Sequence, residues 1–149
     1  MVGPAVSGRP PRLPRPVPAV AVGWDPQPSW TTSGLAALRA AAAEAVARGA
    51  RIEVVAAVAA VDGSDGAARS AAESTLLSSV AALEQEHPGL VVDRVHHDAG
   101  LVGALVAAGQ RADLLVLGRT PGDPVRTHVV ASLVRWSRCP VLLVPPARP

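Results

Sequence analysis

The last third of the chain, residues 113–145, constrains the fold most. An apolar run at 114–117 (LLVL) ends at Gly118, and a second apolar run occupies 141–144 (VLLV). Between them lie a loop broken by proline and glycine and an amphipathic stretch. Short runs that are apolar throughout are typical of parallel strands covered on both faces. The pattern predicts strand, loop, helix and strand, with the loop in a position where ligands bind in α/β sheets.

The same alternation extends through the rest of the sequence. Further strands are expected at 19–23, 51–61 and 90–96. Helices are expected from a cap at Thr32 or Ser33 to about residue 48, over 67–86 and 100–109, and within 124–137. In the first helix Leu35, Leu38, Ala42 and Val46 share a face, and in the last helix Val125, Val129, Leu133 and Trp136 do. This order predicts an α/β fold: a doubly wound, five-stranded parallel sheet with helices on both faces.

Length and composition favour one globular domain. The chain has 149 residues, of which 49% are hydrophobic and 17% charged. Residues 1–17 are rich in proline and arginine and predict a flexible or polyproline-like tail, 18–146 form the domain, and 147–149 are a short C-terminal tail.

Charge, cysteine content and hydropathy limit the partners and the compartment. The net charge is only +2, and the arginines are scattered, so no nucleic-acid partner is expected. Cys139 is the only cysteine, which fits a reducing cytoplasm. No apolar run reaches 18 residues, so neither a membrane span nor a membrane partner is expected.

The usual catalytic and metal-binding patterns are missing from the sequence. His96 and His97 are adjacent on a predicted strand and therefore point to opposite faces. No zinc-type cysteine/histidine spacing, nucleophile elbow, P-loop or dinucleotide fingerprint occurs. We therefore expect no catalytic residues, no metal site and no enzyme activity.

A nucleotide-sized site is nevertheless expected where the first and fourth strands end. Asp25 and Gly118 follow these strands, and the loop 119–128 leads into a helix whose N-terminus suits an anion. Asp123 and Pro124 form a strong helix start, which would put a carboxylate on that helix end. A start at Thr127 is the competing possibility, and it would leave the end open to a phosphate.

Four segments together resemble the universal stress protein family: V-A-V-G-W-D at the first strand, R-G-A-R after the first helix, L-L-V-L-G, and C-P-V-L-L-V-P. The resemblance covers about residues 17–145. It implies a strand order of 3-2-1-4-5 and a homodimer formed through the last strand (Val141, Leu142, Leu143, Val144). It also implies ATP as a ligand, with Mg²⁺ only if ATP binds.

The resemblance assigns ligand roles to residues of this chain. Asp25 matches the family's acidic residue, Val58 matches a second-strand residue near the adenine, and Gly118 matches the first glycine of the family pattern G-x-x-G-x9-G-[ST]. The remaining cofactor-binding candidates lie in or just after the loop: Arg119, Thr120, Gly122, Thr127, His128 and Val129.

The loop departs from the family pattern. Pro121 stands at the second glycine, with Gly122 next to it, and the G-[ST] pair falls on Thr127 and His128 about four residues early. Proline removes a backbone donor, and a shorter loop has fewer amides for a triphosphate. We expect a non-catalytic stress-response domain with a degenerate site that binds ATP weakly or not at all. The alternatives are a functional ATP binder, which would include a slow ATPase, and a dimerisation module without a ligand.

Overall fold

The computed structural model describes residues 17–25, 31–57, 66–97 and 100–146. One parallel sheet has the order β3-β2-β1-β4-β5. Its strands are β1 (Ala19–Trp24), β2 (Arg51–Ala57), β3 (Val92–His97), β4 (Leu114–Gly118) and β5 (Val141–Val144). The helices of the described segments are α1 (Thr31–Arg48), α2 (Gly66–Glu86), α3 (Leu101–Arg111) and α4 (Pro124–Trp136). The predicted fold class and strand order are confirmed.

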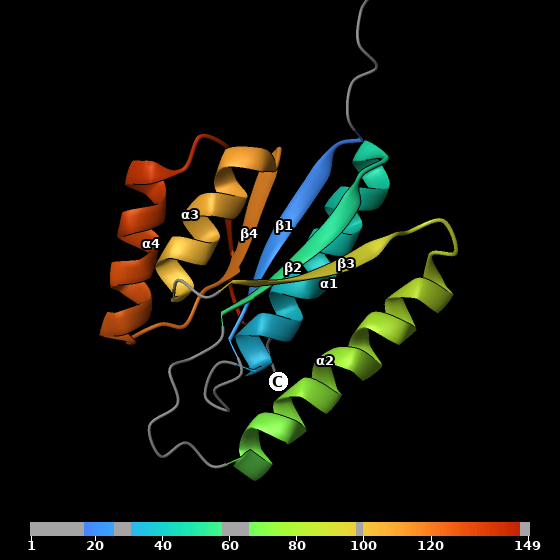
Figure 1. Ribbon diagram of the computed structural model, residues 1–149, viewed down its shortest axis with the longest axis horizontal. Helices are drawn as coiled ribbons and strands as arrows, with labels where there is room; N and C mark the ends of the chain where they lie inside the picture. Colours follow the sequence, from blue (N-terminus) through green and yellow to red (C-terminus); the bar gives the residue numbers. More distant parts are fainter. Residues whose placement is uncertain (1–16, 26–30, 58–65, 98–99, 147–149) are drawn as a thin grey trace, which may run out of the picture.

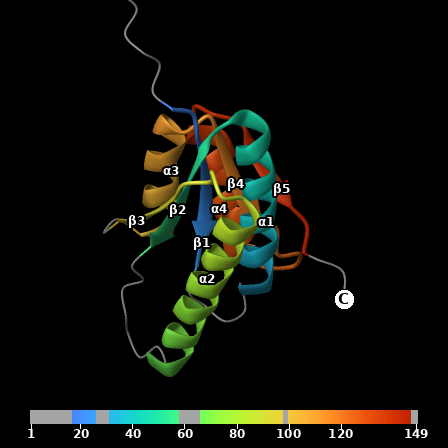
Figure 2. The same ribbon diagram turned by 90° about the vertical axis from the view of Figure 1, so that its right-hand side faces the viewer.

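Helices cover both faces of the sheet (Figure 1). Alternate residues of β1 explain the arrangement, because Val20, Val22 and Trp24 pack into the core under α1 and α2, whereas Ala21 packs into the core under α3 and α4. In Figure 2 the sheet separates α1 from α3. No helix in the described part of the chain is long and apolar enough to cross a membrane.

Some local expectations differ from the structure. α1 begins at Thr31, so Thr32 and Ser33 lie inside its first turn and do not precede it as caps. Val46 and Trp136, expected on buried helix faces, are 50% and 61% exposed. β5 is half-buried and not covered on both faces, because it is the last strand of the sheet. The tails 1–16 and 147–149 and the end of the second predicted strand, residues 58–61, lie outside the described residues.

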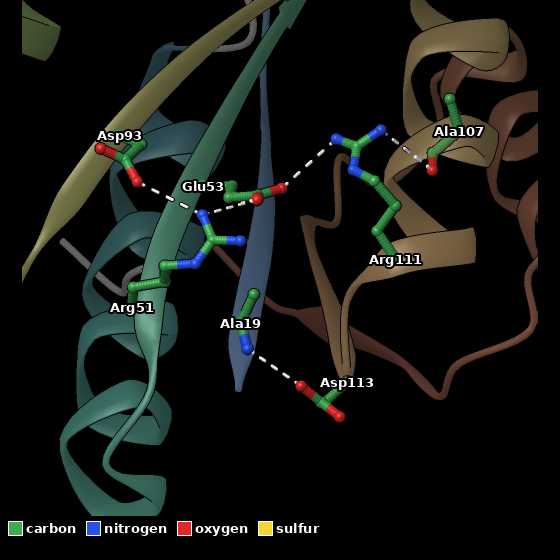
Figure 3. Close-up of polar contacts among 7 residues, drawn as sticks. All are labelled: Ala19, Arg51, Glu53, Asp93, Ala107, Arg111 and Asp113. Carbon is green, nitrogen blue, oxygen red and sulfur yellow. Dashed lines mark hydrogen bonds and ion pairs between the residues drawn. The ribbon is translucent and has the colours of Figure 1, made fainter. Parts of the chain in front are cut away.

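A polar network stabilises the edge of the sheet at which the strands begin (Figure 3). The carboxylate of Glu53 in β2 is almost fully buried and contacts Arg51 Nη1 at 2.8 Å and Arg111 Nη2 at 3.4 Å. Arg51 also contacts Asp93 of β3 at 3.3 Å. The backbone N–H of Ala19 donates to Asp113 Oδ2 at 2.9 Å. Glu53 thus ties the end of α3 to the sheet at the edge opposite to the expected ligand site.

Candidate functional site

The candidate site lies where β1 and β4 end. These strands are parallel neighbours, with Val22 paired to Val116, so Asp25 and Gly118 reach the same edge of the sheet. The first turn of α1 packs directly on this edge. A Cβ atom at Gly118 would lie 2.3 Å from the carbonyl oxygen of Ser33. Close packing against α1 is therefore a sufficient reason for glycine at position 118.

The loop after β4 is attached on both sides. Thr120 Oγ1 lies 3.1 Å from Oγ of Ser33, a hydroxyl that is buried in the first turn of α1. The backbone N–H of Arg119 donates to the carbonyl oxygen of Val144 in β5 at 2.7 Å, while the Arg119 side chain is exposed. The loop thus joins α1 to the edge strand.

The loop closes in a tight turn. Pro121 and Gly122 occupy its centre, and the N–H of Asp123 donates to the carbonyl of Thr120 at 3.3 Å. Gly122 has φ 78°. Proline followed by a residue of positive φ is the pattern of a type II turn. The glycine is therefore needed for the turn, and the proline supplies no amide to a ligand.

Asp123 is the N-cap of α4. Its Oδ1 accepts a hydrogen bond from the backbone N–H of Arg126 at 3.3 Å. Its carbonyl oxygen accepts from both the backbone N–H and the hydroxyl of Thr127, each at 3.0 Å. The predicted start at Pro124 is confirmed, and the alternative start at Thr127 is wrong. A carboxylate already faces the positive end of this helix.

Arg126 lies within the predicted ligand loop 119–128 but is not among the cofactor-binding candidates named from the sequence. Its side chain is only 3% exposed. Burial lowers the pKa of its guanidinium, and the nearby carboxylates of Asp25 and Asp123 oppose that shift. The available signal was helical spacing, since Arg126, Val129 and Leu133 follow the i, i+3, i+7 pattern of one face. The site thus has a buried cation, on the first turn of α4, beside two carboxylates.

The other candidates are spread around the start of α4. Thr127 and His128 are exposed on its first turn, whereas the side chain of Val129 is buried in the core. Thr120 is half-buried, Gly122 is exposed, and Val58 lies outside the described residues. The ligand roles of all these residues stay predictions. Within the described residues, no three acidic, histidine or cysteine side chains gather as a metal site would require.

Trp24 is a second residue of interest at this edge. Its ring is buried against Gly34, where a Cβ would lie 2.9 Å from Cζ3. Its indole nitrogen is buried without a hydrogen-bond partner in the described part of the chain. An indole N–H usually finds a partner when it is buried, so this atom is an unusual feature of the end of β1.

Comparison with known families agrees with this architecture. The model of the universal stress protein family matches residues 31–145, which is most of the chain. The chain belongs to the universal stress protein family. A search of curated protein sequences finds no match.

Solved universal stress proteins have the same fold. A family member from Burkholderia pseudomallei is 25% identical, with 87% of this chain and 96% of that chain covered and a TM-score of 0.59. A protein from Archaeoglobus fulgidus in complex with dAMP is 19% identical, with 86% and 97% covered and a TM-score of 0.57. A protein from Arabidopsis thaliana with AMP bound is 16% identical, with 87% and 92% covered and a TM-score of 0.63.

Proposed function

We propose that this universal stress protein is a non-catalytic regulatory domain of the stress response. Its nucleotide site is degenerate and binds ATP weakly or not at all. The observation that carries the proposal is Arg126, a buried cation beside the carboxylates of Asp25 and Asp123. The two carboxylates outweigh the single guanidinium, so these three groups leave a net negative charge that does not attract a phosphate.

The polar groups of the loop support the same reading. Asp123 uses the backbone N–H of Arg126 and places a negative charge where a phosphate would otherwise meet the helix. Thr120 is bonded to Ser33, and the hydroxyl of Thr127 donates to the backbone of its own helix. These internal hydrogen bonds support the proposal of a degenerate site, because the groups that make them are engaged within the protein.

The test is calorimetric titration of the whole protein with Mg-ATP. No binding in the low-micromolar range is expected, and an affinity in that range would overturn the proposal. The same titration with AMP checks whether a smaller anionic ligand is still accepted. Boiled protein should release no material that absorbs like adenine.

A functional nucleotide binder is the second candidate, and a slow ATPase would belong to it. It is favoured by the fold neighbours that hold AMP and dAMP, and by the position of Asp25 at the edge where β1 ends. If it holds, nucleotide copurifies with the protein and Asp25→Ala weakens its binding. Mg²⁺ would then be required only together with a polyphosphate.

We also propose that the protein forms a homodimer through β5, a role that needs no ligand. β5 is a short apolar strand at the edge of the sheet, and Leu143 is 37% exposed. The opposite edge strand, β3, carries Asp93 and Arg94. Charged side chains protect an edge strand from pairing, whereas an apolar edge invites it.

A further inference from the structure

Exposed apolar side chains gather far from the candidate site, at the edge where the strands begin. Val17, Val46 and Val91 are each at least half exposed. All three line a hollow of about 450 Å³ between the end of α1, the end of α2 and the segment before β3. Lone exposed apolar residues are normal, but a contiguous group around a hollow indicates a surface that binds something.

This hollow continues into a groove between α1 and α2. The second hollow, of about 600 Å³, is lined by Leu35, Leu38 and Ala42 of α1 and by Ala82 and Leu83 of α2. Val46, Glu86 and His87 line both hollows. Val46, expected in the core, is half exposed at this junction. The two hollows form one continuous groove, here called the α1–α2 groove.

We propose that the N-terminal segment, residues 1–16, binds in the α1–α2 groove of its own chain. The described chain begins at Val17, and Val17 itself lines the groove. Any segment that precedes Val17 is therefore held next to this apolar surface. The effective concentration of such a tethered ligand is on the order of millimolar, so even weak intrinsic affinity suffices for binding.

The segment is long enough to fill the groove. From Gly49 to Leu35 the groove follows α1 for about 21 Å, at about 1.5 Å per helical residue. Sixteen residues in a polyproline II conformation reach about 50 Å, at about 3.1 Å per residue. Fewer than half of these residues therefore span the groove.

The chemistry of the segment fits the groove. Residues 1–16 contain five prolines, the apolar Val6 and Leu13, three arginines and no acidic residue. Proline-rich segments lose little conformational entropy when they bind apolar surfaces, because the polyproline II helix is preformed. Glu86 lines both hollows and provides a carboxylate for an arginine of the segment. Arg39 lines only the second hollow, and Arg51, which lines only the first, is paired with Glu53.

The test uses trypsin on the whole protein. Arg9 and Arg15 are followed by proline, which trypsin does not cut, so Arg12–Leu13 is the cleavable bond of the segment. The rate of cleavage at this bond is measured by mass spectrometry for the wild-type protein and for a synthetic peptide of residues 1–18. The bound segment should be cut at least tenfold more slowly than the peptide.

Variants identify the groove as the cause. Val46→Lys and Ala43→Lys place a positive charge at exposed groove positions, where it repels the arginines of the segment, and should raise the cleavage rate towards that of the peptide. The matched control Val134→Lys, at an exposed position on α4, should leave the protection intact. Circular dichroism melting confirms that each variant is folded. Because Val46 and Ala43 are both exposed, at least one folded groove variant is expected.

Three results would overturn the proposal. The first is a wild-type protein cut as fast as the peptide. The second is equal protection in the groove variants and in the control. The third is protection that disappears on dilution together with a dimer seen by light scattering, which would show that a second copy covers the groove.

Discussion

Gly118 is required by packing, whatever the site binds. In Gly118→Ala the new methyl group would lie 2.3 Å from a backbone oxygen of Ser33, which cannot move without shifting the first turn of α1. We expect a loss of about 2–3 kcal/mol in the free energy of unfolding, measured by denaturant titration. Gly89→Ala is the control, because a Cβ at Gly89 meets nothing within 4 Å. Equal stability of the two variants would contradict the packing argument.

Arg126 depends on its neighbouring carboxylates. Burial lowers its pKa, which means that burial makes its charged form costly, and Asp25 and Asp123 offset that cost. A double-mutant cycle of Asp25→Asn with Arg126→Met should give a coupling energy of about 1 kcal/mol in unfolding experiments. The lowered pKa belongs to an arginine, so its titration lies at strongly alkaline pH and adds no pH dependence near neutrality. A coupling energy near zero would show that Asp25 does not compensate Arg126.

The start of α4 is determined by its cap. Asp123→Ala removes the oxygen that accepts the N–H of Arg126, and we expect it to cost about 1 kcal/mol in the free energy of unfolding. Asp123→Asn keeps a capping oxygen and removes the charge, so it separates the cap from the electrostatic effect on Arg126. If Asp123→Ala were as stable as the wild type, the helix start would not depend on this cap.

Glu53 connects β2 to the end of α3 and should matter more than an exposed acidic residue. Glu53→Gln removes a buried negative charge that contacts Arg51 and Arg111, and it should cost about 1–2 kcal/mol. The control is Glu44→Gln, which breaks an exposed pair with Arg48 on α1 and should cost about 0.3–0.5 kcal/mol. Thermal or denaturant unfolding measures both. If Glu53→Gln lowered the free energy of unfolding no more than Glu44→Gln does, burial of the Glu53 carboxylate would not increase its contribution to stability.

The elements that sequence predicted best are those with local determinants. Two adjacent residues, Asp123 and Pro124, determine the start of α4. Gly49, with φ 62°, follows the last residue of α1, near the end expected at about residue 48. Apolar runs identified the strands. Burial could not be predicted in the same way, because it depends on which neighbouring element covers a face. Val46 and Trp136 continue apolar stripes past the part of each helix that is covered, and Arg126 occupies a covered position that an apolar residue usually takes.

At the scale of the whole molecule, the two sheet edges predict how copies assemble. Leu143→Lys places a charge on the apolar edge strand and should convert a dimer into a monomer, measured by light scattering at micromolar concentration. Leu77→Lys, on the exposed face of α2, is the control and should leave the assembly unchanged. If light scattering showed the wild-type protein to be monomeric at this concentration, the proposed dimer would be wrong.

The attachment of the loop after β4 links the candidate site to the edge strand of the sheet. Thr120 is bonded to the first turn of α1, and the neighbouring Arg119 holds the last residue of β5. A ligand that restrains this loop therefore also restrains the strand that a partner subunit would meet. By thermodynamic reciprocity, pairing of two subunits must then change ligand affinity by the same factor by which the ligand changes pairing. Ligand binding at the loop and dimerisation through β5 would then be thermodynamically linked.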